Sequence, residues 1–144
     1  MTKTQSKTPP ARPLEPADTV EWARVQQIVT AAQDTKAEDI IVFDMERRSP
    51  ITDYVLVCSG RSQAHVRGIS ERIQADLRDQ GVRCGSAEGV QEGSWVLMDY
   101  DIVIVHVFHP ETRGYYDLES LFAAYPSVRF ESTPLTPDDA TSAA

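Results

Sequence analysis

The sequence predicts an α/β domain in which a mixed β-sheet is packed with helices. Segments with apolar residues at helical spacing alternate with short runs of β-prone residues, in the order α-β-β-α-β-β-β-α. The apolar runs are nearly continuous, which is typical of strands covered on both faces. A chain of 144 residues also has the length of one domain. Together these observations favour a single sheet with helices packed against it.

Local signals place the first two helices. Asp18 and Glu21 have the spacing of a capping box, which predicts a helix near 19–34. A second helix is expected to begin after Ser62 as its N-cap and to stop at Gly81. The strands expected between these helices are 40–43 and 54–58.

The second half of the chain predicts the rest of the sheet. A modest strand is expected at 82–87, and two strong ones at 95–98 and 102–108. Asp99, Tyr100 and Asp101 form the turn between the strong pair, and a third helix follows near 112–124. The folded domain is expected to span 18–125. The tails at 1–17 and 126–144 are rich in proline and small polar residues, and we expect them to be disordered.

The charge of the chain bears on its partners. The net charge is −8, and no Lys or Arg occurs between Arg83 and Arg113 although several acidic residues do. An acidic domain repels phosphate backbones, so we expect no direct sequence-specific nucleic-acid binding and favour a basic protein partner. A solvated acidic hairpin that serves only solubility is the alternative. No apolar run is long enough to span a membrane, and Cys58 and Cys84 make no disulfide framework. A cytoplasmic protein is expected.

Two motifs leave alternatives open. Asp99 and Asp101 could hold Mg²⁺ in a nucleotidyltransferase-like enzyme, although some forty residues separate them from the turn that begins Ser59-Gly60. The turn from Ser59 to Ser62, at a strand-to-helix junction, could hold an anion in a ligand-binding module. A plain turn with an N-cap is the interpretation that we favour for that second motif, since it lacks further glycines and a following Lys-Ser/Thr. We expect no catalytic residue, cofactor or metal.

Trp95 is the strongest candidate for binding a partner. Strand alternation puts Trp95, Leu97 and Asp99 on one face of the sheet. Trp and Tyr are frequent in binding hot spots because they bury a large area and keep a polar group. The alternative is that Trp95 fills the core. His106, inside an apolar strand, has no zinc-ligand spacing around it and fits a core or interface position.

Several segments resemble one known family in order and spacing. They are residues 51–60 with Ser62, then His65, Val66 and Ile69, then 88–89, 93–100 and 104–108, and last Arg113, Tyr116, 118–119 and 121–122. Over roughly 22–122 the chain resembles the ribosomal silencing factor family, also called the Iojap family. Three features depart from its pattern: Asp101-Ile102 replaces the usual Gly-Asp, Phe122 stands where Trp is common, and the proline-rich tails lie outside the pattern.

The resemblance implies a function that depends on binding and involves no catalysis. It implies a fold distantly like nucleotidyltransferases but without the active site, and often a homodimer. It also implies a translational repressor that binds the fourteenth protein of the large ribosomal subunit. Occupying that surface would block joining of the small subunit when nutrients are limiting. The partner-binding residues implied are Trp95, Asp99 and Tyr100, with Asp53, His106 and Tyr116 as further candidates.

Overall fold

The computed structural model describes residues 12–14, 19–46 and 48–133. Over these residues the chain forms one seven-stranded sheet. In sheet order the strands are β1 (Arg12–Pro13), β7 (Pro126–Phe130), β2 (Glu38–Asp44), β3 (Tyr54–Ser59), β6 (Val103–Phe108), β5 (Trp95–Asp99) and β4 (Ser86–Glu88). β3 runs parallel to β6 and β1 to β7, whereas the other neighbours are antiparallel. The expected mixed sheet is confirmed.

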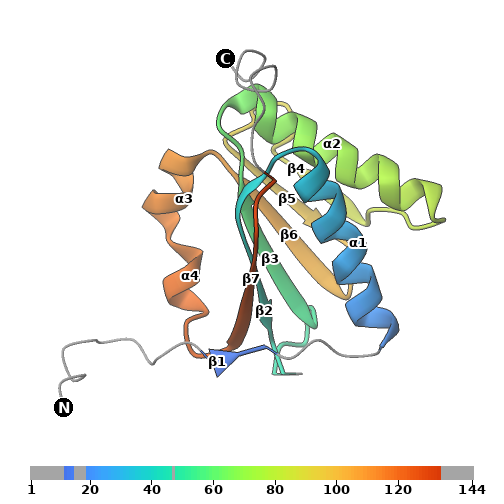
Figure 1. The fold of residues 1–144 in the computed structure, drawn as a ribbon, viewed down its shortest axis with the longest axis vertical. Helices are drawn as coiled ribbons and strands as arrows, with labels where there is room; N and C mark the ends of the chain where they lie inside the picture. Colours follow the sequence, from blue (N-terminus) through green and yellow to red (C-terminus); the bar gives the residue numbers. More distant parts are fainter. Residues whose placement is uncertain (1–11, 15–18, 47, 134–144) are drawn as a thin grey trace.

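Helices cover both faces of this sheet. α1 (Val20–Asp34) and α2 (Gln63–Asp79) lie side by side on one face, and α3 (Pro110–Tyr116) and α4 (Leu118–Leu121) lie on the other (Figure 1). The larger apolar cluster fills the space between the sheet and α1–α2. A smaller cluster, which includes Leu118 and Phe122, lies under α3 and α4. The expected α/β packing is therefore confirmed.

The caps of the first two helices agree with the sequence signals, except that α1 is capped by Thr19 and not by Asp18. Ser62 Oγ accepts a hydrogen bond from the backbone N–H of His65 at 3.0 Å, and Gly81 takes a positive φ of 81° just after α2. At α1 the N-cap is Thr19, whose Oγ1 accepts from the N–H of Trp22 at 3.1 Å. Thr19 is extended, as an N-cap residue must be, and Val20 is already helical. Asp18, the expected cap, lies outside the described residues.

The prediction of a single helix at 112–124 is wrong, because the chain forms two short helices there. Asp117 has a left-handed backbone with φ 48°, which ends α3 and precedes α4. Asp tolerates this conformation better than most residues, and here its carboxylate accepts a 2.6 Å hydrogen bond from the hydroxyl of Ser120. The break turns the chain so that the short α4 can pack its apolar residues onto the sheet.

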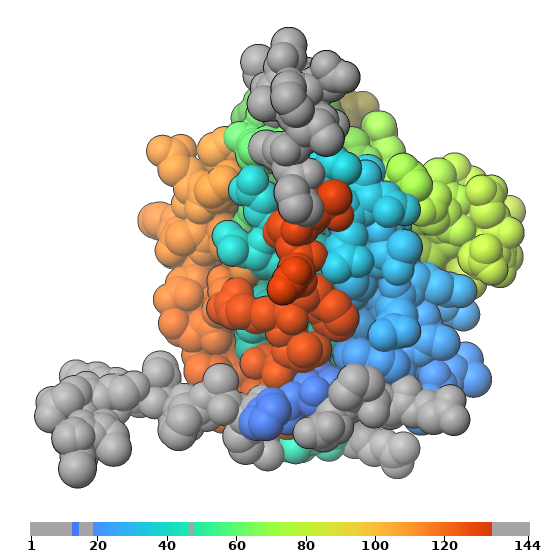
Figure 2. Space-filling view, in the orientation of Figure 1, coloured from blue at the N-terminus to red at the C-terminus, as the bar shows by residue number. Residues whose placement is uncertain are grey.

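The expected boundary of the C-terminal tail is also wrong. Residues 126–130 form β7, which pairs with β2 and lies at the front of the molecule between the α3–α4 segment and α1 (Figure 2). Val128 and Phe130 pack against the larger apolar cluster. A proline at the first position of a strand costs no ladder hydrogen bond, so Pro126 does not prevent the strand. The expected N-terminal tail is likewise wrong at residues 12–14, because Arg12–Pro13 form β1 beside β7 and Leu14 is buried. Residues 1–11, 15–17 and 134–144 of the expected tails lie outside the described residues.

Two strand expectations change with the topology. The modest strand expected at 82–87 is found as β4 at Ser86–Glu88. The strand expected at 102–108 is β6, and it lies between β3 and β5 inside the sheet. Its backbone is therefore paired on both sides, and it offers no free edge to a second copy of the chain.

One face of β5 remains partly exposed. Val96 and Met98 point to the side of α1 and α2 and are fully buried, whereas Trp95, Leu97 and Asp99 alternate with them and are half-buried. This confirms the alternation expected for this strand. The face that carries Trp95 is the one on which α3 and α4 lie, and it holds most of the expected site residues.

Candidate partner-binding site

Four aromatic side chains form a cluster around Trp95. Trp95 stands opposite Phe108 in the β5–β6 ladder, and the two rings stack with centroids 5.0 Å apart. The ring of Tyr116, from α3, lies 4.7 Å from that of Trp95. The indole Nε1–H of Trp95 donates a hydrogen bond of 3.1 Å to Nδ1 of His106. We call these four residues, Trp95, His106, Phe108 and Tyr116, the aromatic cluster.

His106 lies in the inner part of this cluster. It is only 8% exposed and stacks on Phe108 with a centroid distance of 6.1 Å. Burial lowers its pKa to about 4, because a charged imidazolium is poorly solvated there. The ring is therefore neutral at ordinary pH. Because Nδ1 accepts from Trp95, the ring proton must reside on Nε2.

Tyr116 extends the aromatic cluster toward solvent. It is 50% exposed, and Tyr115, which contacts it edge to face at 5.0 Å, is 82% exposed. Tyr115 was not among the expected site residues, since the sequence places it on the expected helix without showing which side of that helix meets the sheet. The signal that could have found it is its position beside Tyr116.

Arg113 holds α3 in place beneath these tyrosines. Its guanidinium is buried and donates to Ser59 Oγ at 2.8 Å and to Glu119 Oε1 at 2.9 Å. Glu119 also binds Arg129, which comes from β7. The end of β3, the two short helices and the last strand are thus joined by one polar network.

Asp99 lies on the face of Trp95 at the other end of β5. Its Oδ1 accepts a 2.8 Å hydrogen bond from the backbone N–H of Asp101, which has a positive φ of 73°. The position that departs from the family pattern therefore adopts a tight turn of the kind that glycine favours. Asp99 remains half-buried, and Asp101 is exposed. The carboxylate of Asp99 lies at the end of β5, two residues beyond Leu97 along the same face.

The expectation that Tyr100 contacts a partner is wrong for this fold. Tyr100 is only 4% exposed and belongs to the larger apolar cluster, on the face opposite Trp95. Burial, followed by the neighbouring Cys84, raises the pKa of its hydroxyl. That hydroxyl has no nitrogen or oxygen partner among the described residues, and the Cys84 thiol is its polar neighbour. Continued alternation from Val96 and Met98 would have placed Tyr100 inside.

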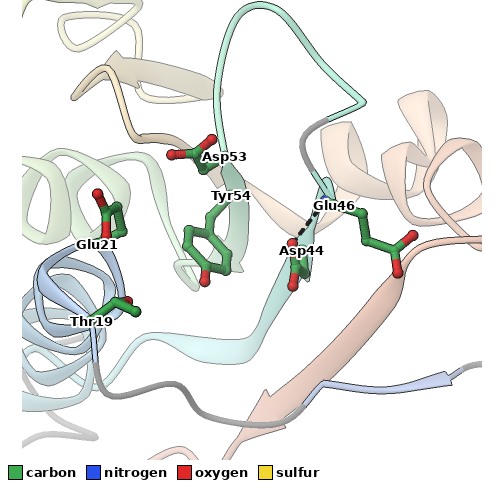
Figure 3. Close-up of a pocket in the computed structure, with 6 residues that line it drawn as sticks. All are labelled: Thr19, Glu21, Asp44, Glu46, Asp53 and Tyr54. Carbon is green, nitrogen blue, oxygen red and sulfur yellow. Dashed lines mark hydrogen bonds between the residues drawn. The ribbon is translucent and has the colours of Figure 1, made fainter.

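Asp53 belongs to a separate, acidic pocket. The pocket has a volume of about 300 Å³ and combines the first turn of α1, the end of β2 and the start of β3 (Figure 3). The pKa of Tyr54 is raised there by burial and then by the charges of Asp44, Asp53 and Glu21. No group of three metal-ligating side chains is found among the described residues. The residues lining this pocket are Thr19, Glu21, Asp44, Glu46, Asp53 and Tyr54.

The two motifs of the nucleotidyltransferase alternative do not meet. Ser59 pairs with Phe108 and Asp99 pairs with Ile104, so the two motifs are offset by four positions along β6. At about 3.3 Å per residue this separation is about 13 Å along the strand. The turn that begins Ser59-Gly60 and the acidic pair therefore lie near opposite ends of β6.

The turn from Ser59 to Ser62 uses its own hydrogen-bonding groups. The N–H of Gly60 donates to the carbonyl of Phe108 at 2.9 Å, and that of Arg61 donates to His65 Nδ1 at 2.8 Å. Ser59 Oγ accepts from Arg113 and Ser62 caps α2. Two backbone N–H groups and both serine hydroxyls of this turn thus already have partners within the fold. No helix in the described part of the chain is long and apolar enough to cross a membrane.

The chain is similar to a family of known proteins over nearly its whole length. Residues 17–144 match the family model described as ribosomal silencing factor during starvation. The chain is 37% identical over 107 residues to the ribosomal silencing factor RsfS of Halalkalibacterium halodurans, which covers 74% of this chain and 92% of that relative. It is 42% identical over 96 residues to the protein of the same name from Bacillus subtilis, covering 67% and 81%.

Solved structures agree with these sequence comparisons. A crystal structure of a Chromobacterium violaceum protein superimposes with a TM-score of 0.71 at 28% identity, covering 83% of this chain and 93% of that one. A crystal structure of a Bacillus halodurans protein gives a TM-score of 0.65 at 36% identity, covering 74% and 96%. The resemblance expected from the sequence motifs is confirmed, and the chain belongs to the ribosomal silencing factor family.

Proposed function

We propose that this chain is a cytoplasmic repressor of translation that binds the large ribosomal subunit through its fourteenth protein. Bound there, it would block joining of the small subunit by occupying space and so lower translation under nutrient limitation. Membership of the ribosomal silencing factor family supports this role. The observation that carries the choice of surface is the half-buried Trp95, held by the aromatic cluster on a partly exposed face of the sheet.

The aromatic cluster has the properties of a binding anchor. Trp95 and Tyr116 offer aromatic area to a partner, and their geometry is already set by Phe108 and His106. A side chain that is ordered before binding loses little entropy when the partner arrives. Aromatic anchors of this kind commonly contribute most of the affinity of an interface.

The charge around the cluster suits a basic partner. Asp99 is on the same face as Trp95, and the exposed Glu88 stands opposite Leu97 in the β4–β5 ladder. No Lys or Arg occurs between Arg83 and Arg113. Proteins that face ribosomal RNA are typically basic, so this acidic surface would steer such a protein toward Trp95. Asp53 lies in the separate acidic pocket and is a weaker candidate for the same interface.

Steric blocking needs a stable interface and no catalysis. Specific protein interfaces bury about 1,200–2,000 Å² in total, which a domain of this size can supply from one face. The side chains proposed to contact the partner directly are Trp95, Asp99 and Tyr116. Tyr100 acts only through the core, since it is buried on the opposite face.

Sedimentation with separated ribosomal subunits tests this function. The purified chain is expected to migrate with the large subunit and not with the small one, and to lower the yield of joined ribosomes when added before the small subunit. The Trp95→Ala variant, added at the same concentration, should lose both effects. Migration with neither subunit, or unchanged joining at saturating protein, would overturn the proposal.

A homodimer is also proposed for the chain in isolation. Leu121 is 70% exposed and Tyr115 is 82% exposed, and both lie on the α3–α4 segment. These apolar side chains offer a helix surface for self-association. The strand β6 cannot serve this purpose, because it is paired on both sides within the sheet.

A further inference from the structure

We propose that His106 is a positioning residue for Trp95. The Nδ1 atom of His106 accepts the hydrogen bond of the indole N–H. A partner then contacts the face of the indole ring and supplies no hydrogen-bond acceptor to it. The inference rests on the proposed function, because it concerns the same surface. It assigns to His106 a role through Trp95 and not a contact of its own. The geometry that carries it is the 3.1 Å hydrogen bond from Trp95 Nε1 to His106 Nδ1.

The position of His106 argues against a direct contact with a partner. Its side chain is 8% exposed, stacks on Phe108 and stands opposite Leu97 in the ladder. A partner that covers this face would reach Trp95 and Leu97 before it reached the imidazole. His106 can therefore influence binding only through the hydrogen bond that it accepts from the indole.

The hydrogen bond removes a cost that binding would otherwise carry. A partner that buries Trp95 takes its N–H away from water, and a buried donor without an acceptor is expensive. Because His106 accepts that hydrogen in the free protein, the donor stays satisfied when the partner arrives. Losing this acceptor is expected to weaken binding about tenfold, in line with the free energy of one unsatisfied donor.

The same bond defines what the partner presents to Trp95. With its one donor in use, the indole offers an aromatic surface and no free polar group. Such a surface accepts an aliphatic chain or a cation, and the long side chains of Lys and Arg provide both. A basic stem lying over Trp95, with its charged end near the acidic residues of this face, is the contact we infer.

A double-mutant cycle on the full chain tests the inference. The variants are His106→Leu, which removes the acceptor at similar volume, His106→Asn, whose Oδ1 can replace Nδ1, and Trp95→Phe, which removes the donor. Affinity for isolated large subunits is measured for each and for the His106→Leu/Trp95→Phe pair, with thermal melts beside it. We expect His106→Leu to bind about tenfold more weakly, and His106→Asn to recover most of this loss.

The decisive comparison is between the two backgrounds. If His106 acts through Trp95, His106→Leu should change the affinity of Trp95→Phe by less than about twofold, since no donor remains to be held. An equal loss in both backgrounds would show a direct contact and overturn the proposal. Wild-type affinity in a folded His106→Leu variant would overturn it as well.

Nuclear magnetic resonance of the wild-type protein supplies a test without ribosomes. The indole signal of Trp95, assigned by its loss in Trp95→Phe, should exchange with solvent more slowly than in His106→Leu. The nitrogen shifts of His106 should report the tautomer with its proton on Nε2. A proton on Nδ1, or an indole that exchanges equally fast in both proteins, overturns the inference. If the wild type binds no large subunit, the proposed function fails while this readout still decides the hydrogen bond.

Discussion

Trp95 of β5 and Phe108 of β6 stand directly opposite each other in the antiparallel ladder, and their rings stack at 5.0 Å with planes 27° apart. One side of the indole therefore belongs to the packing of the domain. The side chain as a whole is only half-buried. A single residue can then contribute to both folding and binding, and experiments on it have to separate the two.

Trp95→Ala is expected to weaken large-subunit binding about thirtyfold or more, the effect of truncating a hot-spot aromatic by about 2 kcal/mol. The loss in free energy of unfolding should stay below the roughly 3–5 kcal/mol that a fully buried Trp would cost, because this side chain is partly exposed. Binding and thermal melts on the same samples measure both. Val20→Ala, at an exposed apolar position on α1, is the control. Binding that only follows the folded fraction would mean that Trp95 is a core residue.

Asp99→Asn and Asp99→Lys should slow association with the large subunit, the second more than the first. Asn retains an oxygen that can accept from the Asp101 N–H, so it removes charge and spares the turn. The difference in association rate between these variants and the wild type should shrink at high salt, because the Debye length falls from about 10 Å at 0.1 M to about 3 Å at 1 M. Association rates at both salt concentrations test this. Asp79→Lys, exposed on α2, controls for overall charge; an Asp99→Lys rate equal to wild type at low salt would contradict the expectation.

Tyr100 should matter for stability and not for binding. Tyr100→Phe removes a buried hydroxyl that lacks an oxygen or nitrogen partner among the described residues, so stability should stay equal or rise by up to about 1 kcal/mol. Tyr100→Ala should lower the free energy of unfolding by about 3–5 kcal/mol through the cavity it leaves. Urea denaturation measures both. A Tyr100→Phe variant that melts like wild type but binds more weakly would return Tyr100 to the interface.

Glu119 should make stability depend on acid pH. Burial disfavours its ionised form, but the hydrogen bonds and charges of Arg113 and Arg129 outweigh burial and lower its pKa from the usual 4.5. A carboxyl with a lowered folded pKa adds stability above its unfolded pKa, and this is lost as pH falls through the folded value. Glu119→Gln should therefore be about 1.5–3 kcal/mol less stable at pH near 7 and should approach wild type below its unfolded pKa.

Urea denaturation of Glu119→Gln and wild type across this pH range checks the expectation. Glu111→Gln, exposed in the first turn of α3, is the matched control and should track wild type throughout. A constant gap between Glu119→Gln and wild type at every pH would mean that Glu119 acts by packing and not by its charge.

Self-association should depend on the exposed apolar side chain of Leu121. Leu121→Lys is expected to shift sedimentation equilibrium toward monomer at tens of micromolar, roughly the range in which a micromolar dimer is visible. Val20→Lys, exposed at the start of α1, is the control that should leave the dimer unchanged. A wild type that is wholly monomeric at these concentrations would remove the dimer from the proposal.

The sequence by itself determined most elements and the family. Ser62 and Gly81 predict the limits of α2 because a cap and a left-handed stop are local events. The alternation of Trp95 and Leu97 with Val96 predicts the two sides of β5 for the same reason, since successive side chains point to opposite faces. Motif order over roughly 22–122 predicts the family without knowledge of any contact.

The tertiary structure alone decided which residues meet. Residues 126–130 form a strand because β2 is present to pair with them, and their sequence, which begins with Pro126, carries no sign of that partner. Asp53 and Trp95 belong to separate sites because the pairing of β3 and β5 with β6 puts them near opposite ends of that strand. The hydrogen bond from Trp95 to His106 likewise joins residues that are adjacent only across the β5–β6 ladder. Local chemistry determines the elements, whereas pairing and packing between distant segments determine the site.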